Sequence, residues 1–173
     1  MEKELKKKRL AKYITVGIFI LFAVSCIIGF SIEGADSIFE KKDGGGSAAV
    51  GTIEIRCDEL LSNMDKVDND SLKEYIPEDG VILPVTEYEG TTENTVFDVL
   101  EYVCRTSDIH MEFKDDTVNK SKYVKGINHL YEKNAGTYSG WKFKVNGEEP
   151  SYGSSSVYLN DGDVIQWYYT CEL

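Results

Sequence analysis

The sequence predicts a mixed α+β fold, in which a sheet of about six strands packs against one main helix, preceded by an N-terminal transmembrane helix. Three observations carry this prediction: short segments with alternating apolar residues, one segment with helical apolar spacing, and one 20-residue run without a charge. About 120 residues follow the uncharged run and its linker, enough for a domain to bury its own core.

The uncharged run, residues 13–32, is long enough to cross the hydrocarbon core of a membrane as a helix. Lys6, Lys7, Lys8, Arg9 and Lys12 precede it, and such basic clusters stay on the cytoplasmic side. We therefore expect a cytoplasmic stub at 1–12, a single-pass anchor in the cell membrane at 13–32, and an extracytoplasmic C-terminal domain.

Two alternatives to the anchor remain open. A cleaved secretory signal has an apolar stretch of about 7–15 residues, shorter than this run. Lipidation at Cys26, the runner-up, fits the lipobox-like residues 23–26, although residues 27–30 continue apolar where a lipoprotein usually turns polar.

The chain is strongly acidic, with a net charge of −11. Residues 1–32 have a net charge of +4, so residues 33–173 carry −15. This charge repels a nucleic-acid backbone and excludes DNA and RNA as default partners. The stretch 33–51 ends in the Gly/Ser-rich sequence KKDGGGSAAVG and is predicted to be a linker, so the folded domain is expected at 52–173.

Alternating apolar residues predict the strands, and Pro84 marks one of them as an edge strand or a strand end. Asn146-Gly147 is a strong hairpin signal, whose return strand is expected at 157–159. The predicted strands are Thr52–Cys57, Val81–Val85, Ile109–Phe113, an extended stretch within Tyr123–Tyr131, Trp141–Val145 and Val164–Cys171.

One helix is predicted to begin at Thr95, because Thr95 and Asp98 have the spacing of a capping box. Its apolar residues recur at helical spacing and should pack on the sheet. They are Val96, Val99, Leu100, Val103 and Cys104.

Cys57 and Cys171 both end strands on the apolar face. Because an extracytoplasmic compartment permits disulfides, we expect them to be bonded across neighbouring strands. Cys104 lies on the helix stripe and is interpreted as a buried small residue rather than a nucleophile.

Catalytic and metal-binding patterns are missing from the sequence. Its two histidines, His110 and His129, have no zinc-site spacing, and no nucleophile elbow, phosphate loop or dinucleotide motif occurs. The acidic stretch at 65–70 lacks the glycine and glutamate of a calcium loop. We therefore expect a protein that is not an enzyme and holds no metal, and no cofactor is identified with certainty.

Aromatic residues concentrate in the last 51 residues, where Tyr138 and Tyr152 lie in loops rich in Ser and Gly. Tyrosine is common both at recognition surfaces and in strands, so for these two residues both readings stay open. Trp141 and Trp167 fall on the inward face of their strands and are expected in the core.

From residue 52 to the end, the chain resembles the transcobalamin-like C-terminal domain of uncharacterised surface proteins from Gram-positive bacteria. The matching segments occur in order: Ile55–Cys57, Pro77–Leu83, Thr95–Leu100, Gly126–Asn128, Ser139–Trp141, Val145–Gly147, Asp161–Ile165 and Tyr169–Cys171. The resemblance implies a β-grasp fold, a mixed sheet clasping the helix at 95–106, related to soluble-ligand-binding β-grasp modules.

In the vitamin carriers this domain covers one face of cobalamin, through a loop and strand that correspond to residues 138–143. The resemblance thus implies a site for a corrinoid-like ligand near Tyr138, Ser139, Trp141, Phe143 and Tyr152. Relatives often carry cysteines at the positions of Ala135 and Ser154, which suggests that a disulfide has been lost here. The helical half of the carriers' site has no counterpart, so this domain alone offers at most half a pocket.

The sequence therefore predicts a membrane-anchored, non-catalytic binding module that recognises a small ligand together with a partner protein. The alternative is a structural or protein-interaction domain of a bacterial cell-surface assembly.

Overall fold

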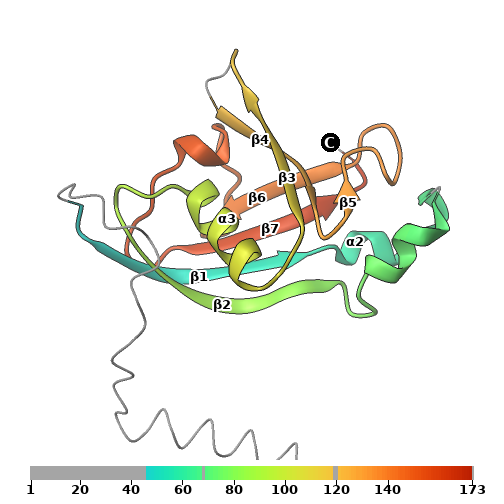
Figure 1. Cartoon of the computed structure of the whole chain (residues 1–173), viewed down its shortest axis with the longest axis horizontal. Helices are drawn as coiled ribbons and strands as arrows, with labels where there is room; N and C mark the ends of the chain where they lie inside the picture. Colours follow the sequence, from blue (N-terminus) through green and yellow to red (C-terminus); the bar gives the residue numbers. More distant parts are fainter. Residues whose placement is uncertain (1–45, 68, 119–120, 173) are drawn as a thin grey trace, which may run out of the picture. The chain divides into compact units, whose positions relative to one another are not determined.

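The computed structural model describes residues 46–67, 69–118 and 121–172, which form a mixed α+β fold made mostly of sheet (Figure 1). The strands are β1 (Ala48–Arg56), β2 (Val81–Thr91), β3 (Met111–Asp116), β4 (Ser121–Ile127), β5 (Leu130–Tyr131), β6 (Gly140–Val145) and β7 (Val164–Thr170). The helices are α2 (Asp58–Leu61) and α3 (Val96–Thr106), with the 3₁₀ turns η1 (Met64–Lys66), η2 (Asp70–Tyr75) and η3 (Ser154–Ser156).

Four strands make the main sheet, in the order β2-β1-β7-β6. The central strands β1 and β7 are parallel, and each has an antiparallel neighbour at the edge. β1 begins at Ala48, within the stretch predicted to be linker, because Ala49 and Gly51 already lie on the strand's buried face.

Helix α3 lies over one face of this sheet (Figure 1). It begins where the sequence predicts, and both halves of the capping box at Thr95 and Asp98 are formed. The predicted apolar stripe is confirmed, since all of its residues are buried, including Cys104. Burial of these apolar side chains against the sheet therefore holds α3 in place.

The second sheet has the order β3-β4-β5, and Asn128 and His129 form the two-residue turn between β4 and β5. Both turn residues have positive φ, 51° and 63°, as a tight hairpin turn requires. The predicted extended stretch at 123–131 is thus divided by a turn into two strands.

The Asn146-Gly147 turn is confirmed, with φ of 53° and 85° at its two residues. The predicted return strand at 157–159 is wrong, because β6 pairs with β7 instead. Residues 157–159 lie instead at the start of α3, where Leu159 is buried and the Val157 carbonyl accepts the backbone N–H of Val96.

Strand β2 is an edge strand, as Pro84 predicts, but it extends to Thr91. Its register against β1 shifts around Pro84, since Ile53 pairs with Thr86 while Ile55 pairs with Leu83. Such an irregularity with a proline protects the edge from pairing with another strand.

The predicted disulfide is not formed, and Cys57 and Cys171 are both buried free thiols. The register explains this, because Arg56 pairs with Tyr168 and so brings Cys57 level with Tyr169. Cys171 lies two residues further along, about 6–7 Å in an extended strand, while the chain turns into α2 directly after Cys57.

The predicted stub, anchor and lipidation residue, within 1–32, lie outside the described residues. Within the described ranges, no helix is long and apolar enough to span a membrane.

Candidate functional site

The loop between β5 and β6, residues 132–139, is held from beneath by the buried side chain of Ser139. The Ser139 hydroxyl accepts the backbone N–H of Ala135 at 3.0 Å and the Tyr169 hydroxyl at 2.8 Å, and it donates to the Gly136 carbonyl at 2.8 Å. Gly136 has φ of 104°, a conformation that favours glycine. The loop is therefore a built feature with a fixed shape.

Trp141 and Phe143 follow this loop on β6 and are part of the core packing. The Trp141 indole donates to the Leu130 carbonyl at 2.8 Å and meets the Tyr169 ring edge-on at 5.3 Å between centroids. Phe143 is half-buried and stacks on Trp167 at 5.1 Å. The predicted core positions of both tryptophans are confirmed, at 8% and 3% exposure.

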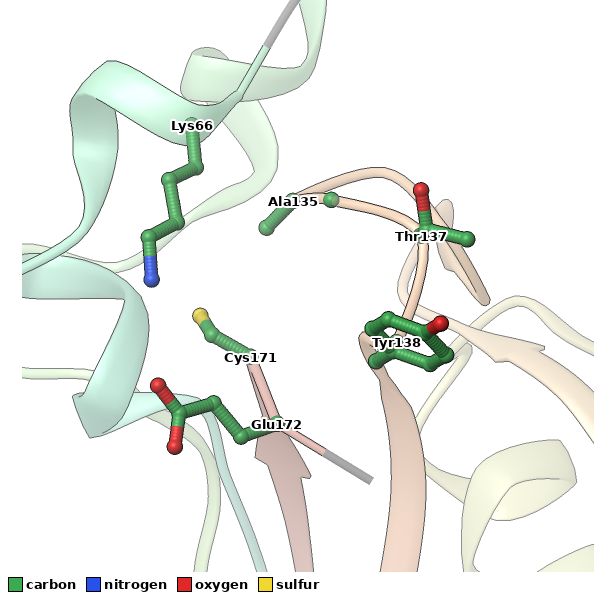
Figure 2. Close-up of a pocket in the computed structure, with 7 residues that line it drawn as sticks. Lys66, Ala135, Thr137, Tyr138, Cys171 and Glu172 are labelled. Atoms are coloured by element: carbon green, nitrogen blue, oxygen red, sulfur yellow. The ribbon is translucent and has the colours of Figure 1, made fainter.

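Tyr138 is different, because its side chain is 70% exposed at the rim of a cavity of about 470 Å³. The loop, η1 and the end of β7 form this cavity (Figure 2). It is lined by Lys66, Ala135, Gly136, Thr137, Tyr138, Cys171 and Glu172. We call it the Tyr138 cavity.

Charged and polarisable groups converge in the Tyr138 cavity. Figure 2 shows the Lys66 ammonium and the Cys171 thiol pointing toward each other, with the Tyr138 ring across the gap. Burial raises the pKa of Cys171 and the carboxylate of Glu59 adds to this, while Lys66 opposes it. Cys171 therefore stays a neutral thiol at neutral pH.

The hydrogen bonds around Cys171 are structural. Its backbone N–H donates to the Glu59 side chain at 2.9 Å, which ties the end of β7 to α2.

The described residues contain no cluster of three His, Cys, Asp or Glu side chains that could hold a metal ion. The cavity offers a cation, a carboxylate and an aromatic face, an arrangement suited to binding a ligand.

Tyr152 is 73% exposed but lies outside the lining of the Tyr138 cavity. Of the five residues that the sequence singled out for ligand binding, the structure therefore places only Tyr138 at a cavity wall. Ser139 supports the loop from below, whereas Trp141 and Phe143 pack on Tyr169 and Trp167.

Sequence reasoning missed Lys66 and Glu172 as site residues. Lys66 is about 70 residues from Tyr138 along the chain, and nothing in its surroundings distinguishes it from other surface lysines. Only the fold brings η1 to the β5–β6 loop.

Comparison with known proteins adds a family match over part of the chain. The family model "Domain of unknown function (DUF4430)" matches residues 93–171, from the loop before α3 to Cys171. This span contains the whole β5–β6 loop, and the match to a domain of unknown function agrees with the family resemblance predicted from the sequence.

Two solved structures resemble the chain. Haptocorrin, crystallised in complex with Cbi, is 15% identical with a TM-score of 0.54, covering 75% of this chain and 27% of haptocorrin. The chain thus spans about a quarter of haptocorrin's length, and at this identity the likeness shows a shared fold. A protein of Ruminococcus gnavus, solved as a proposed metal-binding protein, is 11% identical with a TM-score of 0.41, covering 70% of this chain and 96% of that protein. No curated protein matches the chain.

Proposed function

We propose that the folded domain of this chain is a non-catalytic binding module that takes a small, corrinoid-like ligand at the Tyr138 cavity. One observation carries this proposal: a tyrosine 70% exposed to solvent stands on a loop whose base is fixed by buried hydrogen bonds. A stiff aromatic ring that is already positioned loses little entropy on binding. The similarity to haptocorrin, a protein crystallised with Cbi, supports the ligand class.

The cavity is open on one side, which fits a ligand shared with a second protein. A ligand pocket usually buries most of its ligand, and a shallow wall formed by one loop and one strand end covers only one face. The proposal therefore includes a partner that closes the other face, in a β-grasp arrangement where the sheet and α3 support the loop.

Placement outside the cell membrane is part of the same proposal. The basic stub at 1–12 and the apolar run at 13–32 support a single-pass anchor, with lipidation at Cys26 as the alternative attachment. A tethered module would present its loops to extracytoplasmic ligands through the linker that follows.

A tryptophan fluorescence titration tests the ligand. The full chain in detergent is titrated with cobalamin, cobinamide and haem, with Trp141 and Trp167 as reporters and correction for the absorbance of each ligand. Saturable quenching by a corrinoid supports the proposal. A flat response to both corrinoids, in a sample shown by circular dichroism to be folded, contradicts it.

The alternative function, a protein-interaction domain of a cell-surface assembly, is favoured by a different observation. Tyr152 and Tyr158 are 73% and 61% exposed and both lie outside the Tyr138 cavity, a feature common at protein interfaces. Crosslinking in membranes distinguishes the two functions: a partner lost on Y152A but kept on Y138A supports the interaction domain.

A further inference from the structure

A second cavity, of about 560 Å³, lies where the end of α3 meets the β4–β5 turn. It is lined by Tyr75, Cys104, Arg105, Asp108, Ile109, His110, Asn128 and His129. We call it the histidine cavity. None of these residues lines the Tyr138 cavity, so the two sites are separate.

The chain has two histidines, and both line this cavity with their rings stacked. The imidazoles of His110 and His129 are 4.4 Å apart between centroids with 20° between their planes. Tyr75 packs on His129 at 4.4 Å, and Tyr131 lies 6.0 Å from His110. Imidazole gains its charge between about pH 5 and 8, so two stacked rings repel each other when both are protonated.

Three residues with positive φ also line the histidine cavity. They are Asp108 at 54°, Asn128 at 51° and His129 at 63°. Asn128 donates its amide to the Tyr75 carbonyl at 2.6 Å. The hairpin turn accounts for Asn128 and His129, and the C-terminal end of α3 accounts for Asp108, so tight local turns fix this part of the cavity lining.

Arg105 supplies a fixed positive charge at the same place. Among the described lysines and arginines, only Lys66, Arg105 and Lys133 make neither an ion pair nor a ring contact. In a chain of net charge −11, an arginine without an acidic partner is available for an external anion. Its guanidinium matches the geometry of carboxylate and phosphate oxygens.

The acidic groups around the cavity are few. Asp108 is the one carboxylate in the lining. Glu112 on β3 interacts with the charge of His110, but Lys125 and the Tyr131 hydroxyl already engage it. The Cys104 thiol is buried, and burial raises its pKa to about 12, so it adds no negative charge.

We propose that the histidine cavity binds a small oxyanion, a carboxylate or a phosphate group, held by Arg105 and by the imidazoles of His110 and His129. Binding strengthens as the pH falls, because each proton gained by the stack adds a positive charge facing the anion. By linkage, the bound anion favours the protonated rings to the same extent.

The test is an NMR titration of the full, untagged chain in detergent, with ¹³C-labelled histidine. Only two Cε1–H signals arise, since the chain has two histidines. Inorganic phosphate and acetate are added separately at pH 5.5 and 8. We expect saturable shifts of both signals at pH 5.5, at least tenfold weaker binding at pH 8, and titration curves of both rings moved to higher pH by the anion. Tighter phosphate binding assigns a phosphate-bearing ligand, and tighter acetate binding a carboxylate.

Two variants and a matched control make the test specific. R105Q should weaken binding about tenfold, as expected for losing a charged hydrogen-bond partner. D108N should strengthen it, an effect that damage to the fold does not mimic. K133Q removes an equally unpaired, exposed charge outside the cavity and should leave the affinity unchanged. The proposal is overturned by signals that do not respond to either anion at pH 5.5, or by K133Q weakening binding as much as R105Q.

Discussion

Ser139 allows the rigidity of the Tyr138 loop to be measured. Its side chain is fully buried, and Ser139→Ala removes one oxygen without changing the backbone. The Tyr169 hydroxyl would keep its second acceptor, the Tyr131 carbonyl at 2.8 Å, and the Gly136 carbonyl would keep the Ser139 backbone N–H at 3.0 Å. The buried N–H of Ala135 would lose its partner.

A buried donor left without a partner costs about 1–3 kcal/mol. We therefore expect Ser139→Ala to lower the free energy of unfolding by about 2 kcal/mol, and the melting temperature by about 5–10 °C for a domain of this size. Urea and thermal unfolding, followed by circular dichroism, measure both quantities.

Ser154→Ala is the matched control for this measurement. Ser154 is also buried, at 3% exposure, but its hydroxyl makes no hydrogen bond to the described residues. We expect a change below about 0.5 kcal/mol. If Ser139→Ala is as mild as Ser154→Ala, the loop is not held by the hydroxyl, and the reasoning about its fixed shape fails.

Three further predictions concern the rest of the domain. Thr95→Ala removes the capping hydroxyl of α3 and should cost about 1 kcal/mol in urea unfolding, so an unchanged midpoint would show that the capping box is not stabilising. Arg56 lowers the pKa of Asp58 through a 2.5 Å ion pair, so the stability that this pair adds is present at neutral pH and is lost as the pH falls through the ordinary carboxyl range. D58N should therefore flatten the acid side of the curve of unfolding free energy against pH. A curve with an unchanged acid side would contradict a stabilising role for the ion pair. Burial raises the pKa of Cys57 and Cys104 to about 12, so alkylation mapped by mass spectrometry at pH 8 should be slow in the native protein and fast in urea; rapid native labelling of either would contradict their burial.

Local signals in the sequence predicted the local structure well. The capping pair at Thr95 and Asp98 with its apolar stripe located α3, because a helix depends on neighbours three and four residues apart. Asn146-Gly147 located a turn for a similar reason, since few residues adopt positive φ in succession.

Pairing between distant strands could not be predicted in the same way. Cys57 and Cys171 lie on the buried face, as the alternation of apolar residues predicted, but the parallel register of β1 and β7 offsets the two residues along the sheet. Alternation along a strand predicts the face on which a side chain lies, but it does not predict which residue of the neighbouring strand lies beside it. The β6 partner was missed for the same reason, because residues 157–159 are apolar at the helix cap and do not form a strand.

The candidate site was predicted in part. Tyr138 was singled out by its position in a Ser/Gly loop, whereas Lys66 reaches the cavity only through the packing of η1. The histidine stack joins residues 19 positions apart, on the two sides of the β3–β4 hairpin, and no spacing rule describes such a pair.

The central claim, that Tyr138 marks the ligand site, is tested most directly by equilibrium dialysis of a corrinoid against three full-length proteins: wild type, Y138A and Y158A. Tyr158 is a matched control, because it is similarly exposed and lies outside the Tyr138 cavity. We expect Y138A to weaken binding about tenfold, equivalent to about 1.4 kcal/mol, and Y158A to bind like wild type. Equal binding by wild type and Y138A would contradict the account and place the ligand elsewhere.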